Sequence, residues 1–324
     1  MLSIGNVTVT SSLVLAPMAG ISDLPFRLIN RSLGCGLAFT EMISAISLVH
    51  KSKNTLKMLS AATDDRPLGV QILGDDAEII KRTMDILSEY AFDIIDFNSA
   101  CPAKKVASGG KGAGLLREPV KLQKLLKVIV ENTGLPVTVK IRSGWDETSV
   151  NAVEISLRAQ DAGVKGLFIH GRTKKQGYSG TVDYNIIRQV KESLKIPVIA
   201  SGDALTPDLV RKLFDETGCD GVAVARGALG NPWIFRETAE YLKNRAVPFS
   251  PGVYEISRIM KEHLALNIAF HGEKTGVILF RKFFAWYIRG MALKKLKSRA
   301  FRAGTGDEMM QLIGELQNLP TECH

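Results

Sequence analysis

The sequence predicts an α/β fold, a (β/α)8 TIM barrel followed by a small all-helical C-terminal domain, from three observations. Eight short apolar runs each precede a longer stretch with helical periodicity, and the series occupies about 230 residues, close to the length of such barrels. Several runs are continuously rich in Val, Ile and Leu, as expected of parallel strands that are covered on both faces. After Trp233 the pattern changes, and from Val253 onward only helical periodicity remains.

The eight strands are expected at residues 13–18, 37–42, 67–73, 94–99, 136–142, 166–171, 197–203 and 221–227. Asp75 and Asp76 suit the start of the helix after the third strand, and Pro119 suits the start of the helix after the fourth. Gly134 and Gly163 are expected to end helices. A doubly wound open sheet is the alternative, but no G-x-G-x-x-G follows the first strand, which disfavours a dinucleotide-binding fold.

Two domains are expected, a barrel over residues 1–247 and a helical domain over residues 248–324, because the pattern breaks at Pro248 and Pro251. Residues 281–302 contain eight Lys or Arg and no Asp or Glu, which predicts a continuous basic helix suited to nucleic acid. Three aromatic residues in this stretch recur at helical spacing and are expected in the core of the domain: Phe283, Trp286 and Tyr287.

The composition restricts the class of protein. The chain has 324 residues, 45% of them hydrophobic, and a formal net charge of +9. That charge favours a polyanionic partner, nucleic acid first, although a basic protein kept soluble by its charge fits equally well. The four scattered cysteines form no C-x-x-C pair, so no metal site and no disulfide framework are expected. No signal peptide or membrane-spanning run is apparent, and we expect a cytoplasmic monomer without membrane attachment.

Polar and small residues gather at the ends of the expected strands, where barrels of this type carry their chemistry. From first strand to last, these residues are Ala16, Pro17, Met18, Glu41, Gln71, Asn98, Cys101, Lys140, Arg142, His170, Arg172, Ser201, Gly202, Asp203, Ala225, Arg226 and Gly227. Gly202 and Gly227 precede helix starts after the last two strands, a common phosphate site, although tight turns alone would explain them. Lys140 lies within an apolar strand and needs an anion or a partner, such as a flavin. Glu41 and Asp96 could act as bases or pair with a cation, and neither receives a role.

Cys101 follows the fourth strand and precedes Pro102, two lysines and a glycine-rich segment. An ordinary thiol is mostly protonated at neutral pH and can act as an acid. Lys104 and Lys105 would instead favour a nucleophilic thiolate, so the residues leave both roles open. The glycines between Gly109 and Gly114 are expected to let this loop close over a substrate.

Seven motifs occur in order, one at each of seven strand ends: "LAPMAGISDLPFR", "GVQILG", "ACPAKKV", "VTVKIRSGWD", "IHGRTKKQGYSG", "IASGDA" and "ARGALGNPWIF". With these motifs the sequence resembles the bacterial tRNA-dihydrouridine synthases over nearly the whole chain, and their B-type subgroup most closely. The resemblance implies an FMN-dependent barrel with a helical tRNA-binding domain. It also implies that NADPH reduces the flavin and that the flavin passes a hydride to carbon 6 of a flipped-out uracil.

The resemblance further implies roles for particular residues. Cys101 matches the family's catalytic cysteine, which protonates carbon 5 of the uracil, and Asn98 matches the position that faces substrate and flavin. The family's flavin contacts fall on Ala16, Pro17, Met18, Gln71, Lys140, His170, Ser201, Gly202, Asp203, Ala225 and Arg226. Further substrate contacts are expected at Lys104, Lys105, Arg142 and Arg172.

Four positions depart from the family pattern. Ala100 and Ala225 replace glycines, Ser201 replaces an asparagine and Phe283 replaces a histidine. The methyl group of Ala225 stands where backbone approaches a phosphate, whereas Phe283 concerns the C-terminal domain. Two alternatives stay open. One is an FMN-barrel reductase of free pyrimidines or enoate-like molecules, which the basic helical domain disfavours. The other is a non-catalytic RNA-binding protein, which would bind tRNA without flavin.

Overall fold

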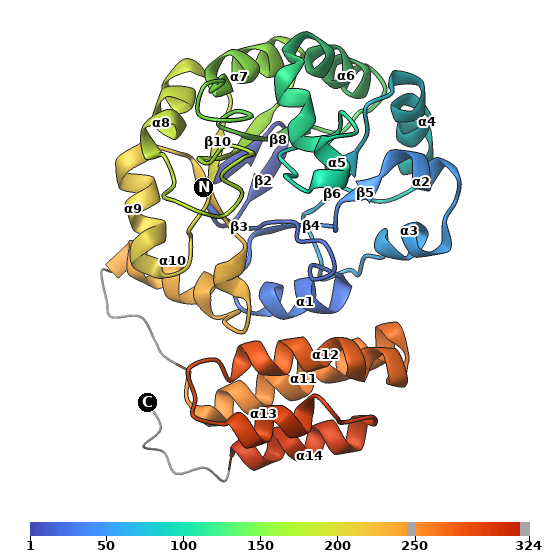
Figure 1. Ribbon diagram of the computed structural model, residues 1–324, viewed down its shortest axis with the longest axis vertical. Helices are drawn as coiled ribbons and strands as arrows, with labels where there is room; N and C mark the ends of the chain where they lie inside the picture. Colours follow the sequence, from blue (N-terminus) through green and yellow to red (C-terminus); the bar gives the residue numbers. More distant parts are fainter. Residues whose placement is uncertain (245–250, 318–324) are drawn as a thin grey trace.

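A computed structural model describes residues 1–244 and 251–317 and contains a closed parallel barrel. Its eight strands are β3 (Leu13–Leu15), β4 (Leu37–Phe39), β6 (Leu68–Leu73), β7 (Ile94–Ser99), β8 (Val137–Arg142), β9 (Gly166–His170), β10 (Val198–Ser201) and β11 (Gly221–Val224). The barrel closes where β11 pairs with β3, and a short extra strand, β5 (Ile43–Ser44), pairs in parallel with the last residues of β6. The predicted (β/α)8 fold is therefore confirmed (Figure 1).

Helices surround the strands, as Figure 1 shows. They are α1 (Leu24–Ser32), α2 (Ala45–Val49), α3 (Lys53–Met58), α4 (Ala77–Leu87), α5 (Lys104–Ala107), α6 (Pro119–Glu131), α7 (Ala152–Asp161), α8 (Tyr184–Ser193), α9 (Pro207–Thr217) and α10 (Ile234–Asn244), with 3-10 turns η1 (Gly112–Arg117) and η2 (Arg226–Ala228). The predicted start of α4 is confirmed, because the Asp76 carboxylate accepts a hydrogen bond from the Ile79 backbone N–H.

An N-terminal hairpin, β1 (Leu2–Ile4) and β2 (Val7–Val9), closes one end of the barrel and was not expected from the sequence. Its turn contains Gly5 at φ +59°, a conformation that favours glycine. A Cβ added at Gly166 or Gly221, the first residues of β9 and β11, would come within 3.2–3.3 Å of hairpin side chains. The hairpin therefore covers the end of the barrel where the strands begin.

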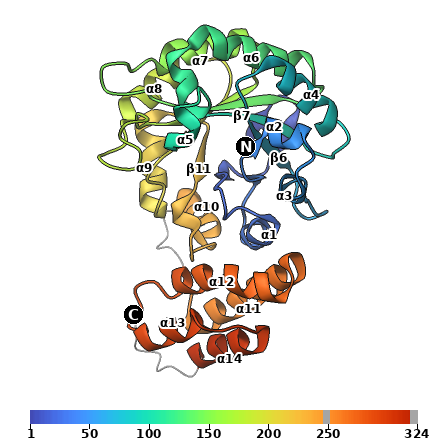
Figure 2. The ribbon, with the colours of Figure 1, turned by 45° about the vertical axis from the view of Figure 1, so that its right-hand side comes forward.

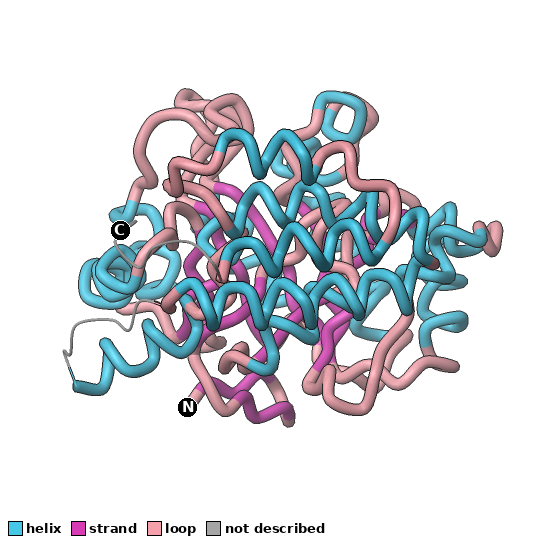
Figure 3. The backbone as a smooth tube through the Cα atoms, turned by 90° about the horizontal axis from the view of Figure 1, so that it is seen from below, coloured by secondary structure: helices cyan, strands magenta, loops and turns pink. Residues whose placement is uncertain are grey.

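The C-terminal domain consists of α11 (Val253–His271), α12 (Glu273–Tyr287), α13 (Lys294–Ala300) and α14 (Gly306–Leu316). It forms a separate layer beside α1 and α10 (Figure 2), and from below its helices lie in front of the barrel strands (Figure 3). The predicted domain boundary between residues 247 and 248 lies outside the described residues.

The prediction of one continuous basic helix over residues 281–302 is wrong. Helix α12 ends at Tyr287 and α13 begins at Lys294. Gly290, between them, has φ +89°, which a right-handed helix does not permit, so the chain turns there. The basic residues are consequently divided between two helices and their connection.

Aromatic packing joins the helical domain to α1 of the barrel. The ring of Phe283 stacks on Phe26 with centroids 5.6 Å apart. Phe283 and Tyr287 are buried as predicted, and Trp286 packs partly buried at their edge. His263 is fully buried, and its Nδ1 lies 3.1 Å from the Tyr287 hydroxyl oxygen. Burial disfavours the charged imidazolium and lowers the pKa of His263 to about 4.

Polar contacts tie the same domain to the loop that follows β3. Lys282 of α12 donates to the Gly20 carbonyl, and the Glu41 carboxylate accepts from the Gly20 backbone N–H. His271 Nε2 lies 2.8 Å from Asp23 Oδ2. The helical domain thus lies against a loop at the open end of the barrel. Throughout residues 1–244 and 251–317, no helix is both long and apolar enough to cross a membrane.

Candidate active site

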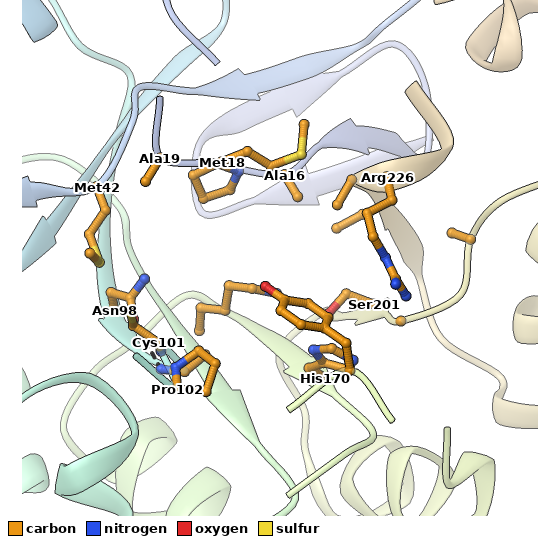
Figure 4. Close-up of a pocket in the computed structure, with 18 of the residues that line it drawn as sticks. Ala16, Met18, Ala19, Met42, Asn98, Cys101, Pro102, His170, Ser201 and Arg226 are labelled. Carbon is orange, nitrogen blue, oxygen red and sulfur yellow. Dashed lines mark hydrogen bonds between the residues drawn. The ribbon is translucent and has the colours of Figure 1, made fainter. Parts of the chain in front are cut away.

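A cavity of about 460 Å³ opens at the ends of the strands opposite the hairpin. Its volume lies in the range of small-molecule and cofactor sites. Every position that the sequence predicted for flavin contact lines it: Ala16, Pro17, Met18, Gln71, Lys140, His170, Ser201, Gly202, Asp203, Ala225 and Arg226. Cys101, Asn98 and Arg142 also line it. In Figure 4, Cys101 and Asn98 lie on one side of the cavity, with His170, Ser201 and Arg226 on the other.

Strand register brings the polar lining of β6, β7 and β8 together. Asn98 is level with Lys140 across the β7–β8 pair, and Gln71 is level with Asp96 across the β6–β7 pair. Residues two apart on a strand point to the same face, so Asp96 and Asn98 both point into the barrel. Asp96 lies one layer deeper than the cavity lining and is 2% exposed.

A series of amide hydrogen bonds holds the backbone at Cys101. Asn98 Nδ2 donates to Gln71 Oε1 at 2.8 Å. Asn98 Oδ1 accepts from the backbone N–H groups of Ala100 at 3.1 Å and Cys101 at 2.9 Å. The side chain of Asn98 therefore turns the chain at the end of β7 so that Cys101 borders the cavity.

The segment after Cys101 is packed rather than open. The Ala113 N–H donates to the Cys101 carbonyl at 3.1 Å. A Cβ on Gly112, which has φ +53°, would lie 3.0 Å from the Cys101 side chain. This glycine therefore allows η1 to pack directly behind the thiol. Among the described cysteines, Cys101 is partly exposed while Cys35 and Cys219 are buried.

Lys140 presents a cation to the cavity beside Ser201. Its Nζ donates to Ser201 Oγ at 2.9 Å, and Ser201 in turn donates to the Ile169 carbonyl at 3.0 Å. Burial lowers the pKa of Lys140, and the nearby charge of Asp96 opposes that shift. The cation is kept within the barrel because a carboxylate lies close to it.

His170 offers an unused polar atom to the cavity. Its Nε2 is buried and has no hydrogen-bond partner among the described residues. Burial, and then the positive charge of Arg142, hold its pKa far below the usual range, so the ring is neutral. Gly202 has φ +113°, and a Cβ there would lie 2.9 Å from the His170 ring. Glycine is therefore required both by the turn and by the histidine.

A family model described as dihydrouridine synthase matches residues 14–321, from the first barrel strand into the C-terminal tail. The chain belongs to the dihydrouridine synthase family. The tRNA-dihydrouridine synthase B of Pseudomonas putida is 39% identical over 321 residues, 99% of this chain and 91% of that protein. The probable tRNA-dihydrouridine synthase of Rickettsia conorii is 37% identical over 292 residues, 90% of this chain and 88% of that protein. The predicted family and the predicted oxidoreductase class are confirmed.

Solved structures share the barrel fold of this chain. Histamine dehydrogenase from Rhizobium sp. 4-9 matches with a TM-score of 0.56 at 12% identity, over 82% of this chain and 50% of that chain. A 2-naphthoyl-CoA reductase matches with a TM-score of 0.60 at 11% identity, over 74% of this chain and 51% of that chain. The alignment spans about half of each of those chains, and it shows the shared barrel alone.

Three residues expected to contact substrate lie outside the cavity lining. Arg172 donates to the Asp203 carboxylate at 2.5 Å and to the Ser179 and Gly180 carbonyls. Its guanidinium therefore supports a loop and an acidic neighbour. The other two, Lys104 and Lys105, are exposed on α5. Asp203 also accepts from Arg226 at 2.9 Å, so it orients an arginine that does line the cavity.

Arg142 joins two walls of the cavity. Its Nε donates to the Ala100 carbonyl at 2.8 Å, and its Nη1 donates to the Thr173 and Gly177 carbonyls at 3.1 and 2.9 Å. The adjacent Tyr178 is 61% exposed and also lines the cavity. The sequence did not point to Tyr178, because this residue lies eight residues past the end of β9. It is on a loop whose carbonyls accept hydrogen bonds from Arg142 and Arg172.

The predicted glycine turns differ in what they do. Gly202 lines the cavity, whereas Gly227 lies outside its lining. A Cβ on Gly227 would come within 2.3 Å of the Ala204 carbonyl oxygen, so this glycine lets η2 pack on the neighbouring turn. Its tight-turn explanation therefore suffices. Ala225 lines the cavity with its methyl group in place.

Proposed function

We propose that this chain is a tRNA-dihydrouridine synthase that binds FMN in the cavity and reduces the 5,6 double bond of specific tRNA uridines with electrons from NADPH. One observation supports the proposal most directly. A partly exposed thiol, Cys101, shares a single cavity with Lys140 and His170, which have donor capacity to spare. The family and the printed names of the relatives agree with this chemistry.

The residues of the cavity fit a flavin. His170 Nε2 lacks a protein partner among the described residues, and Lys140 Nζ bonds only one hydroxyl there, so both have capacity for a polar ligand. Ala16 and Met18 supply apolar surface for a ring system. When bound, FMN supplies a hydride to carbon 6 of the uracil and is re-reduced by NADPH. The charge of Lys140 would hold an anionic group of the cofactor in place.

The chain's own residues then complete the reduction. The Cys101 thiol donates its proton to carbon 5 as negative charge develops on the pyrimidine. Asn98 keeps Cys101 at the rim through the two backbone hydrogen bonds. Arg142 contributes positive charge near the reacting ring, where a preorganised cation stabilises such charge. Tyr178 at the entrance helps exclude water.

The RNA is proposed to reach this cavity along a basic path. A uridine must leave its stack to enter, which favours looped regions of tRNA. We assign RNA binding to the helical domain, residues 248–324, and cofactor binding to residues 1–247. Exposed lysines of α13 and of α5 would contact phosphates. The protein is proposed to act as a cytoplasmic monomer.

Three measurements on one purified sample test the function. Released flavin is identified by chromatography, NADPH oxidation is followed with an unmodified tRNA transcript, and dihydrouridine is quantified by mass spectrometry. We expect FMN, tRNA-dependent NADPH oxidation and dihydrouridine in the digest. Equal turnover of free uracil would favour a small-molecule reductase. Tight tRNA binding by flavin-free protein, with no NADPH oxidation after FMN is added, would favour a non-catalytic RNA-binding protein.

A further inference from the structure

Asp96 is a buried carboxylate beneath the cavity, in contact with residues that line it. We propose that Asp96 is a positioning residue that orients the side-chain amides of Gln71 and Asn98 and, through them, the backbone of Cys101. The inference rests on the proposed function only in treating Cys101 as the group that reacts. Its contacts, and the alkylation test of them below, are independent of uridine reduction.

Both oxygens of the Asp96 carboxylate are engaged. Oδ2 accepts from Gln71 Nε2 at 2.7 Å, and Oδ1 accepts from Thr138 Oγ1 at 2.6 Å. An ionised carboxylate can only accept hydrogen bonds. The Gln71 amide must therefore turn its NH2 group toward Asp96, because the opposite orientation would set its carbonyl oxygen against the carboxylate.

The orientation of the Gln71 amide determines that of the Asn98 amide. With its NH2 group facing Asp96, Gln71 offers only its Oε1 to Asn98, and Asn98 Nδ2 donates to it at 2.8 Å. Asn98 is left with Oδ1 on its other side, the atom that accepts from the backbone N–H groups of Ala100 and Cys101. All the hydrogen bonds run in one sense, from the thiol-bearing loop toward the carboxylate.

The charge of Asp96 has a neighbour that supports it. Burial raises the pKa of Asp96, while its hydrogen bonds from Thr138 and Gln71 and the charge of Lys140 lower it. A buried carboxylate placed only for packing would be replaced by an apolar residue at little cost. The geometry gives Asp96 a different role. An amide at position 96 could present either its oxygen or its NH2 group to Gln71, whereas an ionised carboxylate presents only acceptors.

The kinetic test separates positioning from a general structural role. Asp96 touches neither the cavity nor the RNA-facing surface, so Asp96→Asn is expected to lower kcat about tenfold while leaving KM for the tRNA transcript unchanged. A raised KM for the tRNA transcript with an unchanged kcat would contradict the proposal. An inactive wild-type protein would refute the proposed function but leave the contacts of Asp96 to be tested by the next measurement.

That measurement uses flavin-free protein and iodoacetamide, with alkylation of Cys101 followed by mass spectrometry of its peptide. Asp96→Asn is expected to raise the alkylation rate roughly three- to tenfold, because losing the anchoring bond frees the loop by about that factor. Thr138→Val is the matched control. It removes the other hydrogen bond to Asp96 but leaves the series through Gln71, and its rate is expected within about twofold of wild type.

A double variant distinguishes orientation from packing. In Asp96→Asn/Gln71→Glu, the carboxylate moves to position 71, where it accepts from the amide at position 96 and from Asn98 Nδ2. The orientation of Asn98 is then restored, and we expect an alkylation rate within about twofold of wild type. If Asp96→Asn does not fold, this double variant still decides the question. A wild-type rate in Asp96→Asn, or a raised rate in the double variant, would overturn the proposal.

Discussion

The two ends of this barrel are built on the same strands but serve different purposes. At the end where the strands begin, the interior is apolar and the hairpin seals it with Leu2 and Ile4, both buried. At the end where the strands finish, the interior is polar and opens into the cavity, with Gln71 and Lys140 among its lining. The closed end provides stability, and we propose that the open end provides binding and chemistry.

Strand β7 shows the same change within six residues. Ile94, Asp96 and Asn98 point into the barrel at successive alternate positions. The first is apolar and packs with the hairpin cluster, the second is a carboxylate in the middle layer, and the third is an amide at the cavity. A shift of one residue in register would turn all three side chains outward. Burial of Ile94 at the closed end therefore also fixes the positions of Asp96 and Asn98.

The largest effect is expected at the closed end. Ile4 is fully buried, and Ile4→Ala should lower the free energy of unfolding by about 2–5 kcal/mol through lost burial and a cavity. Chemical denaturation measures this loss. FMN binding by the folded protein should not change, since Ile4 lies at the opposite end from the cavity. Weakened FMN binding with little loss of stability would show that the two ends are not separate in role.

A smaller effect is expected where the barrel meets the helical domain. The folded-state pKa of His263 is lowered to about 4 from 6.5, so its contribution to stability is complete above pH 6.5 and is lost as the pH falls toward 4. Between about pH 7 and pH 4.5, wild type should lose roughly 2–3 kcal/mol of unfolding free energy from this group.

His263→Phe should remove that part of the pH dependence, because the aromatic cluster with Phe26 and Phe283 can accept a ring that does not titrate. Denaturation at the two pH values measures the difference, with His50→Gln, at an exposed position, as control. An identical pH dependence in wild type and His263→Phe would contradict the assignment.

The smallest effect is expected on RNA affinity. Lys294 and Lys297 line a groove of about 510 Å³ along α12 and α13. Lys297→Ala should weaken tRNA binding by about 1 kcal/mol and reduce the salt dependence by about one phosphate contact. Lys124→Ala is the control, because α6 lies across the barrel from the helical domain in Figure 1. Filter binding at several salt concentrations measures both, and equal losses in the two variants would exclude a specific RNA face.

Much of the open end was predictable because its residues come directly at strand ends. Continuous Val, Ile and Leu runs locate the strands, and closure of the barrel then brings their last residues together. Gln71, Lys140 and His170 reached the cavity for this reason alone. Asp96 received no role because its value depends on cross-strand register, which a single sequence does not supply.

Other features required tertiary information. The sequence did not predict the hairpin, because each of its strands has only three residues, too few to establish an alternation of apolar and polar side chains. Tyr178 depends on a loop whose course is set by the hydrogen bonds of Arg142 and Arg172. Arg172 itself was expected at the substrate from its position near a strand end, but Asp203 and two carbonyls take up its donors. The predicted basic helix over residues 281–302 was too long. A glycine such as Gly290 is locally compatible with a helix, so the sequence alone does not mark a break there.

The most direct test of the account concerns the thiol at the open end. Enzyme with pre-reduced flavin is mixed with excess unmodified tRNA, and the rate of flavin oxidation is measured in a single turnover. Cys101→Ala should be slower by about 10²–10⁴, the usual contribution of a general acid, with FMN content unchanged. Cys35→Ala, which removes a buried thiol outside the cavity, should match wild type. A wild-type rate for Cys101→Ala would contradict the assignment of this thiol as the proton donor.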